Sequence, residues 1–344
     1  IIVNLYKSVS SRLVMIIVAV NSRHRRSAYC SRSVRESRFC GASIRVRSIA
    51  GTMPAGDSMT MIPISHTLVS QLEAIAARFP PPAIAALHAP GSADTTTAGK
   101  RDAAFCAVEL QDGAFGLSYL MLGNTLDQLT GNADSASSLQ GQCPLALVRR
   151  FSSSDALERA LALACANALT DSVWRRVGFN PPAAGNSLGD IILSGSDHLG
   201  MIGFFPPLVR QVQGLDCKLT VVELDEAMVL RQRQRFPDVD ISLDRSRLAP
   251  CNVVVGTSTM LLNDTLDAML AAAPRAKHFA VIGPSAGLWP DPLFERGVTL
   301  MGGTRIVDGS RFRAAIANGT SWSASAQKFA IHAADWPGWR RLLA

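Results

Sequence analysis

The chain has 344 residues, of which 48% are hydrophobic and 18% charged, and its mean hydropathy is +0.18. A chain of this length and composition can bury a sizeable core and has room for about two domains of ~150 residues, so an intrinsically disordered protein is excluded. The formal net charge is +7, but residues 1–58 alone carry ten Lys and Arg against two acidic residues. The rest of the chain has no excess positive charge, and we therefore expect that it binds no nucleic acid.

The N-terminal extension, residues 1–58, is rich in Ser and Arg and nearly free of acidic residues. Its apolar run at residues 13–20 is too short to cross a bilayer, which takes ~20 residues. We expect either a disordered, solvated tail or upstream sequence read through before a start at Met53, Met59 or Met61. A targeting segment and a nucleic-acid-binding arm are the alternatives.

The seven cysteines are scattered along the chain and form no C-x-x-C pair. This spacing excludes zinc ribbons and thioredoxin-like sites, and a reducing cytoplasm is the simplest compartment. We expect no membrane association, whereas a homo-oligomer stays open.

The first part of the body, residues 59–180, mixes helices with a hairpin. Apolar residues at helical spacing predict a helix from Ile64 to Phe79, before three prolines. Residues 103–110 and 114–120 flank a glycine-containing turn and predict a β-hairpin. Asp155, with Glu158 three residues later, predicts the capped start of an Ala- and Leu-rich helix. This order indicates a small α+β domain, which ends at a linker rich in Pro, Gly and Asn over residues 179–190.

The second part, residues 190–335, alternates strands with helices. Apolar runs predict strands at residues 199–205, 218–224, 253–255, 278–283 and 298–303. Residues 206–213 predict a helix with proline at its start and glycine after its end, and another helix is expected from Asn263 or Asp264 to Ala273. Such alternation indicates an α/β fold with a parallel, Rossmann-like sheet.

The turn after the strand at 253–255 is the most informative stretch. The strand is expected to end at Gly256, and Thr257, Ser258 and Thr259 form a hydroxyl-rich loop before the helix near Asn263. Free backbone N–H groups at that helix start could cradle a phosphate, a carboxylate or a metal complex, together with the hydroxyl of Thr265. Open α/β sheets bind ligands at such turns. The alternative is that these are only loop and capping residues.

Several segments occur in the order and spacing of one known family. They are residues 200–208, 256–270, 282–285 and 293–298, followed by Gly302 and Gly303. Together they resemble the bacterial and archaeal family of putative heavy-metal chelation proteins. The resemblance covers roughly residues 64–329, and residues 256–270 are its most specific part.

The resemblance implies a Rossmann-like domain preceded by a smaller domain that resembles the N-terminal domain of enolases. A helix of that smaller domain carries a pattern that appears here at residues 164–169 and contains Asn167. The chain departs from the family at two places. It has Asp264 where the family more often has glycine, which adds a negative charge, and Ala286 and Gly287 where the family has Thr-Pro.

Glu223 follows Gly203 by 20 residues, at the end of the second strand. A dinucleotide-binding fold places an acid there on ribose hydroxyls, but the G-x-G-x-x-G fingerprint is missing. A nucleoside-type cofactor such as S-adenosylmethionine is therefore compatible with the pattern, and an exposed acid at a strand end is the plain alternative. Asn167, on an apolar helix, either points into a cleft or satisfies a nearby carbonyl.

Metal ligands and catalytic groups give weak signals. The ligand-type residues near strand ends are not grouped as a preformed site requires, and they are Asp197, His198, Cys217, Glu223 and Cys251. Ser285 lacks the G-x-S-x-G elbow and a histidine base.

We therefore predict one ligand site in a cleft between the two domains. Its walls are expected to be Asn167, Gly203, Phe204, Glu223, Thr257, Thr259, Asn263, Thr265, Gly283, Pro284 and Ser285. The first functional hypothesis is the binding or handling of a divalent metal or a metal–chelator complex. The second is an enzyme that uses an adenosine-type cofactor on a small molecule, and a purely structural interaction module is the third. The sequence leaves open whether the protein is an enzyme.

Overall fold

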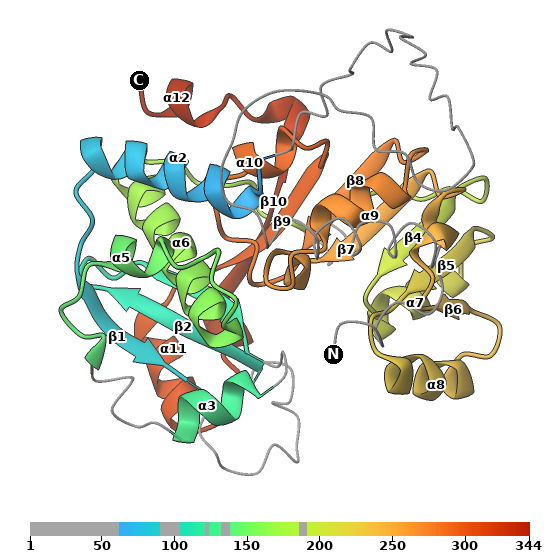
Figure 1. Ribbon diagram of the computed structural model, residues 1–344, viewed down its shortest axis with the longest axis horizontal. Coiled ribbons are helices and arrows are strands. Elements are labelled where there is room, and N and C mark those ends of the chain that lie inside the picture. The colour runs from blue at the N-terminus through green and yellow to red at the C-terminus, as the bar shows by residue number, and fades with distance from the viewer. Residues whose placement is uncertain (1–61, 90–103, 121–123, 132–137, 186–190) are drawn as a thin grey trace, which may run out of the picture. The chain divides into compact units, whose positions relative to one another are not determined.

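The structure is a computed structural model, and it describes residues 62–89, 104–120, 124–131, 138–185 and 191–344 (Figure 1). The expected N-terminal extension lies outside the described residues. Residues 60–344 form one compact unit with a three-stranded and a seven-stranded sheet. No helix in the described ranges combines the length and the apolar character that a membrane span requires.

The small sheet is an antiparallel meander of β1 (Ile84–His88), β2 (Phe105–Leu110) and β3 (Phe115–Tyr119). The predicted hairpin is thus confirmed, with Phe105 paired to Tyr119 and Glu109 to Phe115. β1 adds a strand that the sequence patterns did not indicate. It pairs with β2 through a register shift between Ile84 and Ala86.

Helices cover this small sheet, and the longest is α6 (Ala156–Arg176). The side chain of Asp155 accepts a hydrogen bond from the backbone N–H of Glu158, so the predicted helix cap is confirmed. The predicted first helix is also present as α2 (Ile64–Arg78). The shorter helices are α3 (Thr125–Gly131) and α5 (Pro144–Val148).

The C-terminal segment returns to the small sheet. α11 (Gly309–Ala317) lies beside the small sheet (Figure 1). Its Phe312 packs against Phe115 of β3, and Trp322 joins the same buried cluster. An ion pair of 2.7 Å between Arg313 of α11 and Glu109 of β2 also ties this helix to the small sheet. The small sheet therefore draws part of its core from residues far away in the chain.

The large sheet has the strand order β10-β9-β8-β7-β4-β5-β6. All neighbours are parallel except β9 and β10. Read from β6 to β9, this is the doubly wound order of a Rossmann fold, so the predicted fold class is confirmed. The strands are β4 (His198–Ile202), β5 (Lys218–Val222), β6 (Asp240–Ser242), β7 (Val253–Thr257), β8 (His278–Ile282), β9 (Leu300–Ile306) and β10 (Ala326–His332).

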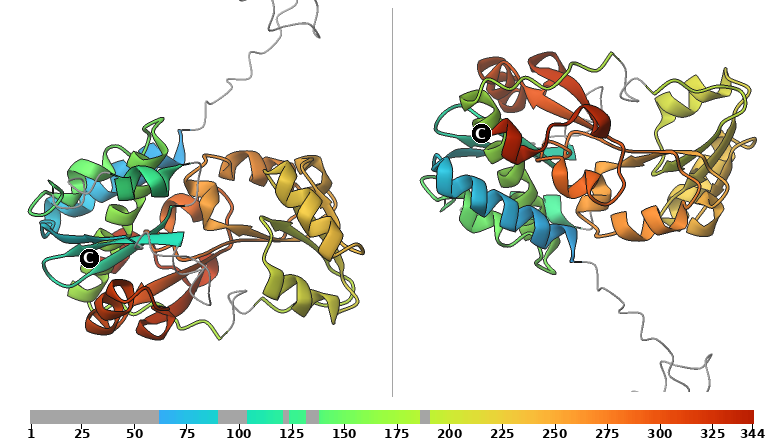
Figure 2. Two further views of the ribbon diagram at one scale, coloured as in Figure 1. Left: turned by 90° about the horizontal axis from the view of Figure 1, so that it is seen from below. Right: turned by 90° about the horizontal axis from the view of Figure 1, so that it is seen from above.

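Helices pack on both faces of the large sheet (Figure 2). α7 (Pro206–Gln213) and α8 (Glu226–Arg235) bury Val209, Val212 and Val229 against one face, and α9 (Leu266–Ala272) buries Met269 in the cluster on the other face. The predicted helix with proline at its start and Gly214 after its end is α7. The short elements are α10 (Asp291–Phe294), α12 (Trp339–Leu342) and the 3-10 helices η4 (Arg245–Leu248), η5 (Ser258–Leu261), η6 (Ser323–Ser325) and η7 (Ala333–Asp335).

The predicted start of the helix after β7 is wrong. α9 begins at Leu266 instead of Asn263 or Asp264, because the first turn after β7 is the 3-10 helix η5. Thr257 caps η5, since its hydroxyl accepts a hydrogen bond from the backbone N–H of Thr259. The N–H groups nearest the end of β7 therefore belong to η5.

Candidate functional site

The order of the large sheet defines where its turns meet. The chain leaves β4 toward β5 and β6, then returns to the other side of β4 for β7, β8 and β9. The ends of β4 and β7 are thus the switch point of the fold, where crevices in open α/β sheets form. Gly203 follows β4 with φ +81°, and a Cβ there would lie 3.1 Å from Cγ2 of Thr257. These two predicted site residues are in direct proximity.

The turn after β8 lies against the turn after β7. Gly283 has φ +148°, and a Cβ on it would lie 2.3 Å from Oγ of Ser258. Only glycine allows this approach without displacing Ser258. Gly283 and Pro284 thus adjoin the Thr257 and Thr259 turn, as expected of neighbouring parallel strands.

Glu223 follows β5 and is half-buried. Burial raises the pKa of its carboxyl above the ordinary value, and Asp225 adds to this rise. The backbone N–H groups of Phe204 and Leu224 act in the opposite direction, because they donate hydrogen bonds to the carboxylate. The bond from Phe204 holds the acid beside the turn after β4. Glu223, Phe204 and Gly203 therefore belong to one group.

Tyr119 joins this group from the small sheet, and the sequence analysis missed it. It is the last residue of β3, and its backbone N–H donates to Oγ of Ser285 at 3.0 Å. Burial raises the pKa of its phenol, and the negative charge of Glu223 raises it further. The two ionisable groups are therefore electrostatically coupled. No local pattern marks Tyr119, because Glu223 is 104 positions away in the sequence.

Asn167 and Ser285 connect the two sheets. Nδ2 of Asn167 donates to the backbone oxygen of Leu117 at 2.7 Å and to that of Ser285 at 2.9 Å. Because both acceptors are carbonyl oxygens, the amide orientation is fixed. Oδ1 of Asn167 is left buried without a hydrogen-bond partner. Asn167 was expected either to point into a cleft or to satisfy a nearby carbonyl. The structure shows the second arrangement, in which its amide satisfies two backbone carbonyls.

Asn263 and Thr265 form a separate turn. The hydroxyl of Thr265 donates to Oδ1 of Asn263 at 2.7 Å. Their backbone N–H groups bond to Thr259 and Met260, respectively. Asp264, between them, has φ +57°, a left-handed conformation that glycine adopts more easily. The glycine that the family resemblance implies at this position would adopt this conformation without strain.

Apart from Glu223, the ligand-type residues named from sequence do not converge on this group. His198 begins β4, so it lies at the amino ends of the parallel strands, and its Nε2 is 2.9 Å from the hydroxyl of Thr220. Cys217 and Cys251 also precede strands β5 and β7. Within the described ranges, no three His, Cys, Asp or Glu residues are grouped so that they could hold a metal ion.

Comparisons with known proteins agree with this architecture. Residues 103–170 and residues 191–335 match two family models that carry the same description, "putative heavy-metal chelation". The first covers much of the small sheet and α6, and the second covers the large sheet.

Two crystal structures of proteins of unknown function from the family matched at residues 191–335 share the fold. The protein from Pyrococcus horikoshii is 18% identical with a TM-score of 0.56, over 78% of this chain and 99% of that chain. The protein from Desulfitobacterium hafniense is 18% identical with a TM-score of 0.54, over 78% of this chain and 98% of that chain.

An uncharacterized protein of Methanocaldococcus jannaschii is 27% identical over 156 residues, which are 45% of this chain and 57% of that protein. The chain thus matches little more than half the length of this curated relative.

The fold and the two matched segments define an α/β protein with a Rossmann-like sheet and a small preceding α+β part. The chain belongs to the family of putative heavy-metal chelation proteins, as the sequence motifs indicated.

Proposed function

We propose that this protein binds a metal–chelator complex at the ends of β4, β5, β7 and β8, next to Tyr119. The observation that carries this proposal is the coupling of Tyr119 to Glu223 across the two sheets. Burial raises the pKa of both groups, and the negative charge of Glu223 raises the pKa of Tyr119 further. A protonated phenol and the neighbouring hydroxyl groups donate hydrogen bonds, which suits a ligand rich in oxygen acceptors.

The residue types favour a complexed metal over a bare ion. Zn²⁺ in proteins takes about four ligands and Ca²⁺ about six to eight, most of them charged or strongly polar. Glu223 is one carboxyl group, and no cluster of three ligating residues occurs in the described part of the chain. A metal that arrives with its own chelator needs no such cluster. The description that the family models carry supports a metal-handling role.

In this proposal the residues divide into three groups. Gly203, Phe204, Glu223, Thr257, Thr259, Gly283 and Pro284 surround the ligand with Tyr119, while Asn167 and Ser285 hold the small sheet in place. Asn263 and Thr265 support the turn that follows η5. The cytoplasm stays the compartment that we expect.

A second candidate is an enzyme with a nucleoside-type cofactor. The position of Glu223 favours this candidate. Glu223 directly follows β5, the strand next to β4, and Rossmann folds put the acid that binds ribose at this place. In that case the carboxylate would accept hydrogen bonds from two vicinal hydroxyls, and a raised pKa would oppose binding at acidic pH.

Thermal-shift measurements on the full chain separate the two candidates. The probes are Ni²⁺, citrate, the Ni²⁺–citrate complex and S-adenosylmethionine. A ligand at a hundred times its Kd stabilises the folded state by about 2.7 kcal/mol. We expect the complex to stabilise more than Ni²⁺ or citrate alone. Stabilisation by S-adenosylmethionine only would favour the second candidate, and no shift with any probe would contradict both.

Variants assign the effect to the site. Tyr119→Phe removes one hydroxyl and should reduce the shift caused by the complex. Glu226→Gln is the matched control, because Glu226 is exposed on α8 one turn beyond the site. Equal losses in both variants would contradict the assigned position of the ligand.

A further inference from the structure

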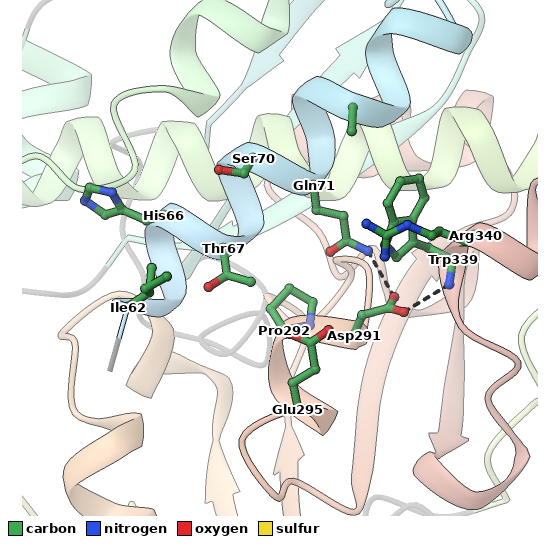
Figure 3. A pocket seen from close by; sticks show the side chains of 11 residues that line it. Ile62, His66, Thr67, Ser70, Gln71, Asp291, Pro292, Glu295, Trp339 and Arg340 are labelled. Carbon is green, nitrogen blue, oxygen red and sulfur yellow. Dashed lines mark hydrogen bonds between the residues drawn. The ribbon is translucent and has the colours of Figure 1, made fainter. Parts of the chain in front are cut away.

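A cavity lies between α2 and the C-terminal elements α10 and α12. Its volume is about 300 Å³, at the lower end of the range for small-molecule sites. It shares no lining residue with the group around Glu223. Figure 3 shows Gln71 of α2 and Asp291 of α10 pointing toward each other at its wall, with Trp339 beside them.

Gln71 presents an unsatisfied acceptor there. Its side chain is buried, with 7% of the residue exposed, and its Nε2 donates to Oδ2 of Asp291 at 3.0 Å. A carboxylate only accepts hydrogen bonds, so the amide nitrogen must face Asp291 and Oε1 must face away. Oε1 has no hydrogen-bond partner and points toward Thr67 and Pro292, which line the cavity (Figure 3). A buried acceptor of this kind calls for an N–H or O–H donor.

The carboxylate of Asp291 is held in place but not neutralised. Its Oδ1 accepts a hydrogen bond from the backbone N–H of Trp339 at 3.0 Å. Both of its donors are uncharged, and no ion pair of Asp291 occurs among the described residues. The guanidinium of Arg296 donates to Ile62, Thr67 and Pro292 at the cavity wall, and its charge is paired with Asp267 at 3.2 Å. A carboxylate in this state attracts a cation.

The remaining charges of the cavity leave a negative balance. Glu295 adds a second carboxylate at the exposed rim, and Arg340 supplies one positive charge. The guanidinium of Arg340 lies 4.5 Å from the ring centroid of Trp339, so a cation already rests on one face of this indole. Pro292 and Trp339 provide apolar wall that methylene groups can contact.

We propose that this cavity binds a small aliphatic primary amine. Its ammonium group supplies an N–H donor for Oε1 of Gln71 and a positive charge for Asp291 and Glu295. Its methylene groups lie along Trp339 and Pro292. This site is independent of the metal–chelator site and needs no residue of it.

Isothermal titration calorimetry of the full chain tests this proposal with 1,4-diaminobutane as the probe. The uncharged comparison is 1,4-butanediol, which has the same carbon chain and also donates hydrogen bonds. We expect saturable binding of the diamine and none of the diol. Equal binding of both compounds, or no binding of the diamine, would overturn the proposal.

Three variants locate the bound amine. Asp291→Asn removes the charge and one of the two oxygens that accept from Gln71 and Trp339, and it should weaken the diamine about tenfold. Glu295 is exposed, so Glu295→Gln should weaken binding of the diamine about threefold without a risk to folding. Glu73→Gln is the matched control, because Glu73 lies on α2 but pairs with Arg149 outside the cavity. Unchanged affinity in the first two variants, or an equal loss in the control, would refute the assigned site.

Discussion

Replacing Asn167 with alanine should lower the free energy of unfolding by about 2 to 3 kcal/mol. The side chain donates two buried hydrogen bonds, to Leu117 and Ser285, and their loss costs about 2 to 3 kcal/mol together. The unpartnered Oδ1 disappears in the same substitution, which returns about 1 kcal/mol. The small void left in the tightly packed helix α6 adds a cost of about 1 kcal/mol.

Urea unfolding followed by circular dichroism measures this change, and Asn318→Ala is the control. Asn318 is exposed at the end of α11, so its replacement should stay within about 0.5 kcal/mol. Asn167→Asp should destabilise more than alanine at neutral pH, because a carboxylate would face two carbonyl oxygens. Its cost should fall at acidic pH, where a protonated carboxyl can donate again. A loss below about 0.5 kcal/mol for Asn167→Ala would show that Asn167 does not connect the two sheets.

Three further predictions concern the same region. Glu223→Gln should become more stable relative to wild type as the pH rises above 4.5. The raised pKa of Glu223 means that its protonated form stabilises the folded wild type, and this contribution is lost at higher pH. A difference in melting temperature that does not change with pH would contradict this. Gly203→Ala should lower the free energy of unfolding by about 1 to 2 kcal/mol for its positive φ, and further through the contact of the new Cβ with Thr257. Thr257→Ser removes Cγ2 and should relieve only this contact. Additive effects of the two changes in urea unfolding would therefore refute their proximity. Arg305→Met should cost about 3 kcal/mol in urea unfolding, because it removes the 2.8 Å ion pair of the buried Asp171; a neutral effect would show that Arg175 suffices there.

The sequence was sufficient for the large sheet because its signals are local. Each of the strands β4, β5, β7 and β8 is a short apolar run between turn residues, and α7 has proline at its start and glycine after its end. The order of these elements then determines where their carboxyl ends meet. Glu223, Gly203 and Thr257 could therefore be named together before any coordinates were known.

The remaining features depend on contacts between distant parts of the chain. Tyr119 became a candidate only because β3 lies next to Ser285, which is 166 positions later. α11 and β10 carry weak local patterns, and they are fixed by packing on the small sheet and on β9. The sequence placed the start of α9 too early, because the hydroxyl of Thr257 caps the 3-10 helix η5 before α9 begins. Residue types alone do not decide whether the first turn after β7 belongs to η5 or to α9.

Anomalous X-ray diffraction from crystals soaked with the Ni²⁺–citrate complex tests the central claim most directly. The account predicts one nickel peak beside Tyr119 and Glu223, with citrate between the metal and the turns after β4 and β7. A peak bound directly by His or Cys side chains elsewhere, with no density beside Tyr119, would contradict it.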